Sequence, residues 1–297
     1  MDGILIIDKP AGPTSHDVVN RVRRIFNTRK VGHAGTLDPF ATGVMVVLVG
    51  KATRLAKFVD KDAKEYEATV RFGYATDTGD LTGERIGETG RSDISSSEIH
   101  SVLDRFHGEI LQTPPMYSAK KVDGKKLYEL ARRGEEIERK AVPVTIHEIS
   151  VVSPDDVSGE HHTIRVRCSA GTYIRTLAED IAKALGTAAH LTELRRTASG
   201  RFSLADSVPL DALADEADPT KRLLPIETLV SGLPHFVLNS ERAKMTLNGL
   251  SSRVYGQEFA ADEPIAMFSE DGQLIAVGKY SADENAIRPT LVLGENI

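Results

Sequence analysis

One acid in this chain, Asp38, stands where a carboxylate can do chemistry, within KVGHAGTLDPFATGVMVVLVGKAT. Pro39 disfavours a helix at Asp38, and Gly32 and Gly35 permit backbone turns that other residues resist. The apolar run over residues 44–49 predicts a buried strand directly after this loop. An acid on a loop beside a rigid strand suits binding or catalysis. A turn aspartate that bonds only its own backbone gives the same local pattern, so both interpretations stay open at this point.

The elements around this loop mix strands and helices without a regular βαβ repeat or a phosphate-binding loop, and this mixture predicts an α+β fold. Ser15 can cap one helix, and Ser95 with Glu98 forms a capping box before another. Strands are expected over residues 3–8, 44–49, 66–74 and 163–168, and helices over 15–26, 51–60, 96–106 and 172–185.

Composition is that of an ordinary globular protein: 297 residues, of which 40% are hydrophobic and 27% charged. The single cysteine, Cys168, alternates with Ile164 and Val166 and is expected to be a buried thiol. The nine histidines lack metal-ligand spacing, and His161 and His162 are expected in solvent. The sequence has neither a signal peptide nor an apolar run of the roughly 18 residues that span a membrane, which predicts a cytoplasmic protein.

Charge is distributed unevenly along the chain, whose net charge is −6. Residues 1–57 carry nine Lys and Arg against four Asp and Glu, whereas residues 202–297 carry seven against fifteen. Basic segments attract phosphates even on a protein of negative net charge. The basic N-terminal segment therefore allows a nucleic-acid partner, although ordinary solvated helix faces account for Arg21, Arg23 and Arg24 equally well.

Four segments resemble the TruB family of tRNA pseudouridine synthases. They are GHAGTLDP with its following ATG, apolar strand and GKAT; GILIIDKPAGPTSHDVV; CSAGTYIRTLAEDIAKALG with AHLTELRR; and TPPMYSAKKVDGKKLYELARRG. They cover most of the first 200 residues in the family's order, so the match is more specific than one short motif. The resemblance implies a pseudouridine-synthase-like mixed or antiparallel central sheet flanked by helices.

This resemblance implies that Asp38 is the catalytic carboxylate of a cofactor-free and metal-free isomerisation of uridine to pseudouridine. Arg175, in GTYIR, is the expected partner that keeps Asp38 ionised, as a bidentate ion pair. From the residues alone, Arg175 can instead pair with Glu179 one helical turn later. Lys9 and Pro10 match the family's first motif and are expected to support the site without reacting.

The same resemblance gives four residues roles around the target base. Tyr66 is expected to stack on the uracil and to assist catalysis, and Tyr173 and Leu194 are expected to line the uridine site. His33 is expected beside the RNA. Without the resemblance, Tyr66 reads as strand packing, Leu194 as core and His33 as a turn residue.

An insertion at about residues 113–140 falls where bacterial members of the family have a mobile segment that clasps RNA. Its basic side chains are candidates for contacts with the RNA backbone. They are Lys120, Lys121, Lys125, Lys126, Arg132 and Arg133. A basic loop in a protein that does not bind RNA has the same composition.

Two domains are expected: a catalytic domain over residues 1–232 and a small β-rich domain over 233–297 that resembles a PUA-type RNA-binding module. The resemblance implies isomerisation of uridine 55 in the T loop of elongator tRNAs by base flipping, without a guide RNA, and a monomer is expected. A guide-RNA-dependent synthase of the dyskerin type and a non-catalytic tRNA chaperone are the alternatives.

Overall fold

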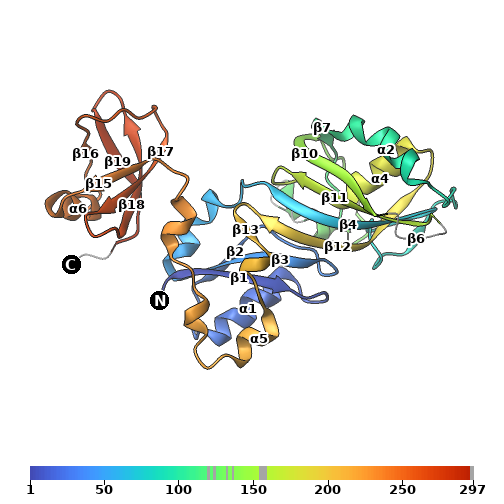
Figure 1. Ribbon diagram of the computed structural model, residues 1–297, viewed down its shortest axis with the longest axis horizontal. Helices are drawn as coiled ribbons and strands as arrows, with labels where there is room; N and C mark the ends of the chain where they lie inside the picture. Colours follow the sequence, from blue (N-terminus) through green and yellow to red (C-terminus); the bar gives the residue numbers. More distant parts are fainter. Residues whose placement is uncertain (119–120, 123–124, 132, 136, 154–158, 295–297) are drawn as a thin grey trace.

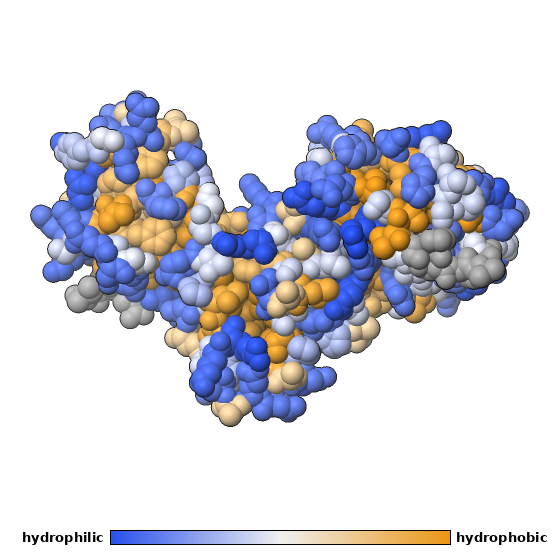
Figure 2. Space-filling view, viewed as in Figure 1, coloured by the Kyte–Doolittle hydropathy of each residue, from blue (hydrophilic) through white to orange (hydrophobic). Residues whose placement is uncertain are grey.

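The computed structural model describes residues 1–118, 121–122, 125–131, 133–135, 137–153 and 159–294, with the backbone alone at 121, 122, 125, 126, 128, 129 and 153. A long mixed sheet is formed by strands between residues 3 and 209, and a smaller sheet forms a separate C-terminal unit (Figure 1). In the space-filling view, a broad hollow lies between this unit and the opposite lobe of the molecule (Figure 2).

The large sheet has ten strands, eight of them in the spatial order β14-β1-β3-β12-β4-β11-β10-β7. β2 pairs with β3 and β13 with β12, while the β1–β14 and β3–β12 pairs are parallel and the others antiparallel. In chain order the strands are β1 (Gly3–Lys9), β2 (Val31–Ala34), β3 (Thr42–Val49), β4 (Lys64–Phe72), β7 (Gly108–Gln112), β10 (Val142–Ser153), β11 (His161–Cys168), β12 (Ala189–Ser199), β13 (Phe202–Ser203) and β14 (Val208–Pro209).

Helices cover one face of this sheet. They are α1 (Ser15–Ile25), α2 (Ser96–Leu103), α4 (Ile174–Ala184) and α5 (Leu210–Asp215). Their apolar side chains join the sheet residues of a single core, which includes Val18, Val22, Ile99 and Leu177. Burial of such a stripe is the main source of helix stability in a protein this size. The α+β fold with a mixed sheet flanked by helices is therefore confirmed.

Of these elements, the sequence predicted strands β1, β3, β4 and β11 and helices α1, α2 and α4, whereas β2, β7, β10, β12, β13, β14 and α5 were not predicted. Two further local differences concern the helices. Thr14, not Ser15, is the N-cap of α1 and forms the capping box with Asp17, which leaves Ser15 free for another contact. The segment after β3 forms a 3₁₀ helix, η1 (Gly50–Phe58). The predicted Ser95–Glu98 capping box is present at α2.

Short elements connect these parts. They are the hairpin β5 (Ala75–Thr76) and β6 (Arg85–Ile86), η2 (Asp104–Phe106), β8 (Lys121–Val122), β9 (Lys125–Lys126), α3 (Leu127–Ala131), η3 (Leu204–Asp206), η4 (Pro219–Arg222) and η5 (Ile226–Val230). Within the described residues, no helix has the length and apolar character needed to cross a membrane.

The C-terminal unit is a five-stranded sheet with one helix across it. Its elements are β15 (His235–Leu238), α6 (Ser240–Leu247), β16 (Ser252–Arg253), β17 (Pro264–Ser269), β18 (Leu274–Ser281) and β19 (Ala286–Val292). A second apolar cluster joins this unit to the back of β1 and β3 through η1 and η5, with Leu55, Val230 and Val277 among its members. Because buried apolar side chains bridge the two parts, they pack as one body. A C-terminal β-rich domain is thus present as predicted.

Candidate active site

The loop that carries Asp38 lies between β2 and β3 and is held from two sides. The Lys9 ammonium at the end of β1 donates to the carbonyl oxygens of Pro39 (3.1 Å) and Ala41 (2.8 Å). The Ser15 hydroxyl, free of the capping role, donates to Leu37 O (3.0 Å) and accepts from Leu37 N (2.9 Å). Hydrogen bonds to backbone on both flanks fix the Asp38 carboxylate better than a turn alone would.

Arg196 of β12 also holds the loop that carries Asp38. It is fully buried, and its Nε and Nη2 donate to Val44 O (2.6 Å) and Gly35 O (3.2 Å). Gly35 has a φ of 79°, in the region where glycine is strongly preferred, whereas Gly32 is an ordinary strand residue of β2. A Cβ at Gly43 would fall 2.2 Å from Arg196 O, so only glycine permits β3 to approach β12 there.

Arg175, in the first turn of α4, contacts Asp38. The Nε–Oδ2 distance is 2.9 Å, and the arginine side chain is 5% exposed against 33% for the aspartate. The other two guanidinium nitrogens donate to Thr78 O (2.7 Å, from Nη1) and Tyr117 O (2.8 Å, from Nη2). The contact is therefore present, but the expected bidentate geometry is wrong: Asp38 is contacted through Nε, while Nη1 and Nη2 are directed at two backbone carbonyls.

A second carboxylate, Asp80, approaches the same guanidinium, with 3.6 Å between Arg175 Nη1 and Asp80 Oδ2. Asp80 is buried, and its Oδ1 accepts hydrogen bonds from Thr78 Oγ1 (2.9 Å) and Thr82 N (2.9 Å). The single positive charge of Arg175 thus lies between two carboxylates, those of Asp38 and Asp80. Glu179, the alternative partner considered from the sequence, is not among the side chains that form ion pairs with Arg175 in the described part of the chain.

A cavity of about 270 Å³ opens beside the Asp38–Arg175 pair. It is lined by Gly35, Thr36, Leu37, Asp38, Asp60, Lys64, Tyr66, Ser118, residues 169–175, Leu194 and Arg196. A volume of this size suits one small ring system. Besides Asp38, four residues predicted from the sequence therefore line the same cavity: Tyr66, Tyr173, Arg175 and Leu194.

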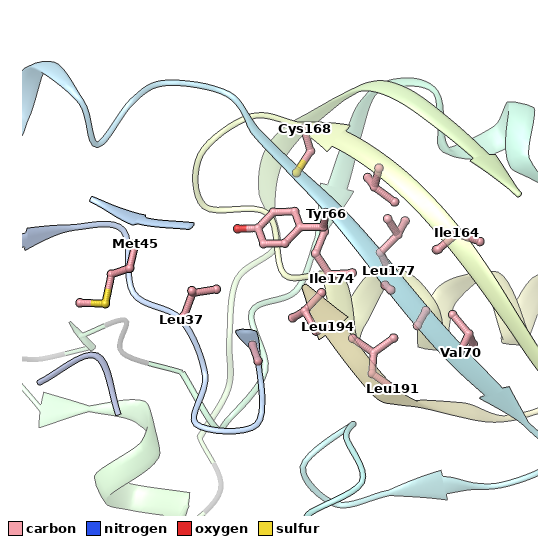
Figure 3. Close-up of a cluster of buried hydrophobic side chains, with 14 of the residues drawn as sticks. Leu37, Met45, Tyr66, Val70, Ile164, Cys168, Ile174, Leu177, Leu191 and Leu194 are labelled. Atoms are coloured by element: carbon pink, nitrogen blue, oxygen red, sulfur yellow. The ribbon is translucent and has the colours of Figure 1, made fainter. Parts of the chain in front are cut away.

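Tyr66 stands at the end of a row of buried apolar side chains. Figure 3 shows its ring between Leu37 on one side and Ile174 and Leu194 on the other. Burial raises the pKa of Tyr66, and the nearby Arg196 guanidinium opposes that rise. The phenol is therefore neutral at physiological pH and offers an aromatic face with a hydroxyl group at its edge.

Tyr173 is the N-cap residue of α4 and keeps extended backbone angles (φ −97°, ψ 107°). Gln112 at the end of β7 binds it twice: Gln112 Nε2 donates to Tyr173 O (3.0 Å), and Tyr173 N donates to Gln112 Oε1 (2.7 Å). The helix begins one residue later, at Ile174, so Tyr173 precedes the helix and Arg175 lies within it. Both side chains nevertheless line the cavity.

Replacing Gln112 with leucine is expected to destabilise the protein by about 1–2 kcal/mol, because Tyr173 N loses its partner and Tyr173 O keeps only Leu177 N (3.0 Å). Gln112→Glu keeps an acceptor for Tyr173 N but places a buried carboxylate beside Tyr173 O, so we expect it to be at least as destabilising. Urea unfolding of both variants measures the difference. Equal stability of the leucine variant and the wild type would contradict this account.

Two ionisable groups of the loop have shifted pKa values. Burial raises the pKa of Asp38; the Arg175 guanidinium opposes this rise, Asp80 adds to it and Lys9 opposes it. Burial lowers the pKa of Lys9 to about 8, against the attraction of Asp38. Perturbed carboxylates in a cavity are frequent at catalytic sites, which favours the chemical interpretation of Asp38 over that of a simple turn residue.

His33 lies on β2, half-buried and outside the set of residues that line the cavity. Burial lowers its pKa, and Arg196 lowers it further, so the imidazole is neutral at pH 7. Of the basic residues predicted in the insertion, Lys120 and Arg132 lie outside the described residues. Arg133 is exposed, and the other three, Lys121, Lys125 and Lys126, occupy the short strands β8 and β9.

Several buried polar residues of the site were not predicted as site residues, among them Lys64, Asp80, Gln112 and Arg196. Lys64 also lines the cavity and donates to three carbonyls, including Asp62 O (2.6 Å). Arg196 lies two residues after the predicted Leu194, but nothing in TELRR distinguishes a buried arginine from an exposed one. Its neighbour Arg195 pairs with Asp8 (2.8 Å) nearer the surface.

The site combines an oriented carboxylate, a neutral phenol, buried cations and an apolar wall. In the described part of the chain, no group of three or more His, Cys, Asp and Glu side chains is arranged to hold a metal ion. A carboxylate in a partly open cavity can act as a nucleophile or a general base toward a flat polar ring held against Tyr66 and Leu194.

Comparison with protein families assigns most of the chain. Residues 23–174 match the N-terminal domain of the TruB family of pseudouridylate synthases, and residues 175–231 match the C-terminal domain of tRNA pseudouridylate synthase B. The boundary between the two matches falls at Arg175, within the site.

Individual proteins give the same result. The chain is 42% identical to tRNA pseudouridine synthase B of Neisseria meningitidis serogroup A over 95% of its length and 92% of the relative's. It is 39% identical to that of Bacillus pumilus, covering 100% and 99%. Among solved structures, a chain of a Cbf5-Nop10-Gar1 complex matches with a TM-score of 0.76 at 28% identity, covering 99% of this chain and 85% of that one. A chain of an H/ACA RNP bound to a substrate RNA containing 2′-deoxyuridine matches with a TM-score of 0.75 at 27% identity, covering 99% and 86%.

Proposed function

The chain belongs to the TruB family of pseudouridylate synthases, and we propose that it isomerises uridine 55 in the T loop of tRNA to pseudouridine without a guide RNA. The observation that carries this proposal is the Asp38–Arg175 pair at the wall of a cavity closed by Tyr66 and Leu194. Its relatives named tRNA pseudouridine synthase B match over nearly their whole length, which supports tRNA as the substrate.

The reaction breaks the N1–C1′ bond, rotates the uracil and joins C5 to C1′, while the C5 proton leaves and N1 gains a proton. Asp38 acts as a nucleophile or a general base at the part of the uracil ring where these bonds break and form. Arg175 keeps its carboxylate ionised against the effect of burial on the pKa. Atoms balance within the substrate and water, so the reaction takes no cofactor.

A detached uracil must be retained while it turns. Tyr66 and Leu194 supply an aromatic face and an aliphatic wall for it, and Tyr173 lies across the cavity. Stacking on the Tyr66 ring is sequence-tolerant and strong enough to hold a flipped base. The neutral Tyr66 hydroxyl can relay the C5 proton.

The remaining parts of the chain fit an RNA substrate. In this proposal the insertion with Arg133 contacts the RNA backbone, His33 lies beside the opened stack, and residues 233–297 form a PUA-like domain that binds the same tRNA. The hollow between the C-terminal unit and the opposite lobe offers room for an RNA stem (Figure 2). The protein acts as a monomer in the cytoplasm, where tRNA is modified.

Single-turnover incubation of the purified chain with unmodified tRNA transcript, followed by pseudouridine mapping, tests the proposal. We expect one pseudouridine, in the T loop, and none when cytidine replaces the target uridine. Product at another position would contradict the assignment to uridine 55, and absence of product would contradict stand-alone activity.

A second candidate is a guide-RNA-dependent synthase, which the likeness to chains from H/ACA complexes favours. Identity is higher to the stand-alone relatives, 42% against 28%, and this supports the first proposal. If bare tRNA is bound but not modified, adding guide RNA separates this candidate from a tRNA chaperone without catalytic activity.

A further inference from the structure

One hydroxyl group on the cavity wall has no hydrogen-bond partner. Ser118 is 5% exposed and lines the cavity, and its Oγ is shielded from solvent without a partner among the described residues. A buried hydroxyl in this state has lost its hydrogen bonds to water and has not replaced them with hydrogen bonds to the protein. In a cavity that binds a polar ring, the ligand can supply the missing partner.

The backbone at this position is fixed to the catalytic pair. Tyr117 O accepts a hydrogen bond from Arg175 Nη2 (2.8 Å), the same guanidinium that contacts Asp38 through Nε. Ser118 N donates to Met116 O (2.9 Å), which tightens the turn. The hydroxyl is therefore one residue away from a direct contact with the Asp38–Arg175 pair.

We propose that Ser118 contacts the substrate, and that its hydroxyl bonds a carbonyl group of the flipped uracil. This inference rests on the proposed function. The ribose stays joined to RNA outside, so the base is the deeper part of the nucleotide. Ser118 is 5% exposed, whereas the Asp38 side chain, which acts near the ribose, is 33% exposed. We therefore expect the base to lie on the Ser118 side of the cavity.

The chemistry of the rearrangement suits a hydroxyl at this point. Turning uracil about the line through C6 and N3 exchanges N1 with C5 and, at the same time, O2 with O4. A hydroxyl that donates to one carbonyl before the rotation meets the other carbonyl after it. Ser118 therefore binds the base in both orientations and favours neither, which suits a residue that retains the detached ring.

The test compares Ser118→Ala with Ser199→Ala. Ser199 Oγ is also buried without a partner, but Ser199 lies at the end of β12 and does not line the cavity. We expect Ser118→Ala to lower kcat/KM on tRNA transcript about tenfold, the effect of one neutral hydrogen bond, with Ser199→Ala unchanged. Neither variant should have a lower Tm, because each loses only an unpartnered group. Wild-type kcat/KM in Ser118→Ala, or a lower Tm without a kinetic effect, would overturn the proposal.

A transcript with 2′-deoxyuridine at the target separates contact with the base from contact with the ribose. We expect the ratio of wild-type to Ser118→Ala rates to be the same on both transcripts. If the ratio falls to one on the deoxy substrate, the hydroxyl binds the 2′-OH and the assignment to uracil is wrong. If the wild type makes no pseudouridine at all, the proposed function fails and the Ser118 inference falls with it. Normal wild-type activity with an unaffected Ser118→Ala contradicts Ser118 alone.

Discussion

Replacing Asp38 with asparagine is expected to abolish pseudouridine formation while the fold and tRNA binding persist. The amide is isosteric but cannot act as a nucleophile or base, so we expect the single-turnover rate to fall by about 10⁴-fold or more. Stability should change by only about 1 kcal/mol, since loss of the ion pair with Arg175 is offset by relief of the cost of burying the carboxylate.

Three measurements make this result informative: single-turnover rate, tRNA affinity and Tm. Unchanged affinity and Tm with no product assign Asp38 to the chemical step. Loss of affinity together with rate would instead indicate that Asp38 organises the loop held by Lys9 and Ser15. Product formation at the wild-type rate would remove Asp38 from the mechanism. Asp60→Asn is a matched control, an acid on the same cavity wall to which we assign no role in the reaction.

The sequence predicted the strand after Asp38, the helix after Tyr173 and the meeting of Asp38 with Arg175. These predictions succeeded for two reasons. Apolar runs and capping residues act locally, so the strands and helices can be read from neighbouring residues. The contact between residues 38 and 175 joins distant parts of the chain, and only the resemblance to the family predicted it.

The sequence did not predict which polar residues are buried. Asp80 occurs in a polar, glycine-rich stretch typical of an exposed hairpin, yet it is buried because Thr78, Thr82 and Arg175 satisfy its carboxylate. His162 was expected in solvent, but it is 2% exposed, and its Nε2 lies 2.7 Å from Ile94 O. In each case one partner lies far away in the sequence, Arg175 for Asp80 and Ile94 for His162, and no local pattern predicts that contact.

The bidentate Asp38–Arg175 pair was a wrong prediction for a related reason. Ion-pair geometry was inferred from the two residues alone, whereas a guanidinium distributes its donors over every acceptor within reach. Thr78 O and Tyr117 O take Nη1 and Nη2, which leaves Nε for Asp38. Arg175 therefore joins three segments around the cavity in addition to balancing a charge.

Replacing Arg175 is expected to have the second largest effect, on both stability and rate. Arg175→Leu leaves Asp38 and Asp80 without their shared cation and two carbonyls without donors, which should cost about 3–5 kcal/mol of stability. Arg175→Lys keeps the charge but cannot reach all four acceptors from one nitrogen, so it should cost less yet still lower the rate about 10²-fold or more. Urea unfolding and single-turnover assays measure the two effects.

The pH dependence of the rate shows whether Arg175 also acts on the charge of Asp38. An active carboxylate loses activity as the pH falls through its pKa, and burial already raises the pKa of Asp38. Weakening the contribution of Arg175 raises this pKa further, so the acid limb of the rate profile should move to higher pH in Arg175→Lys than in the wild type. An acid limb at the wild-type position, with the rate still reduced, would mean that Arg175 positions the carboxylate without controlling its ionisation.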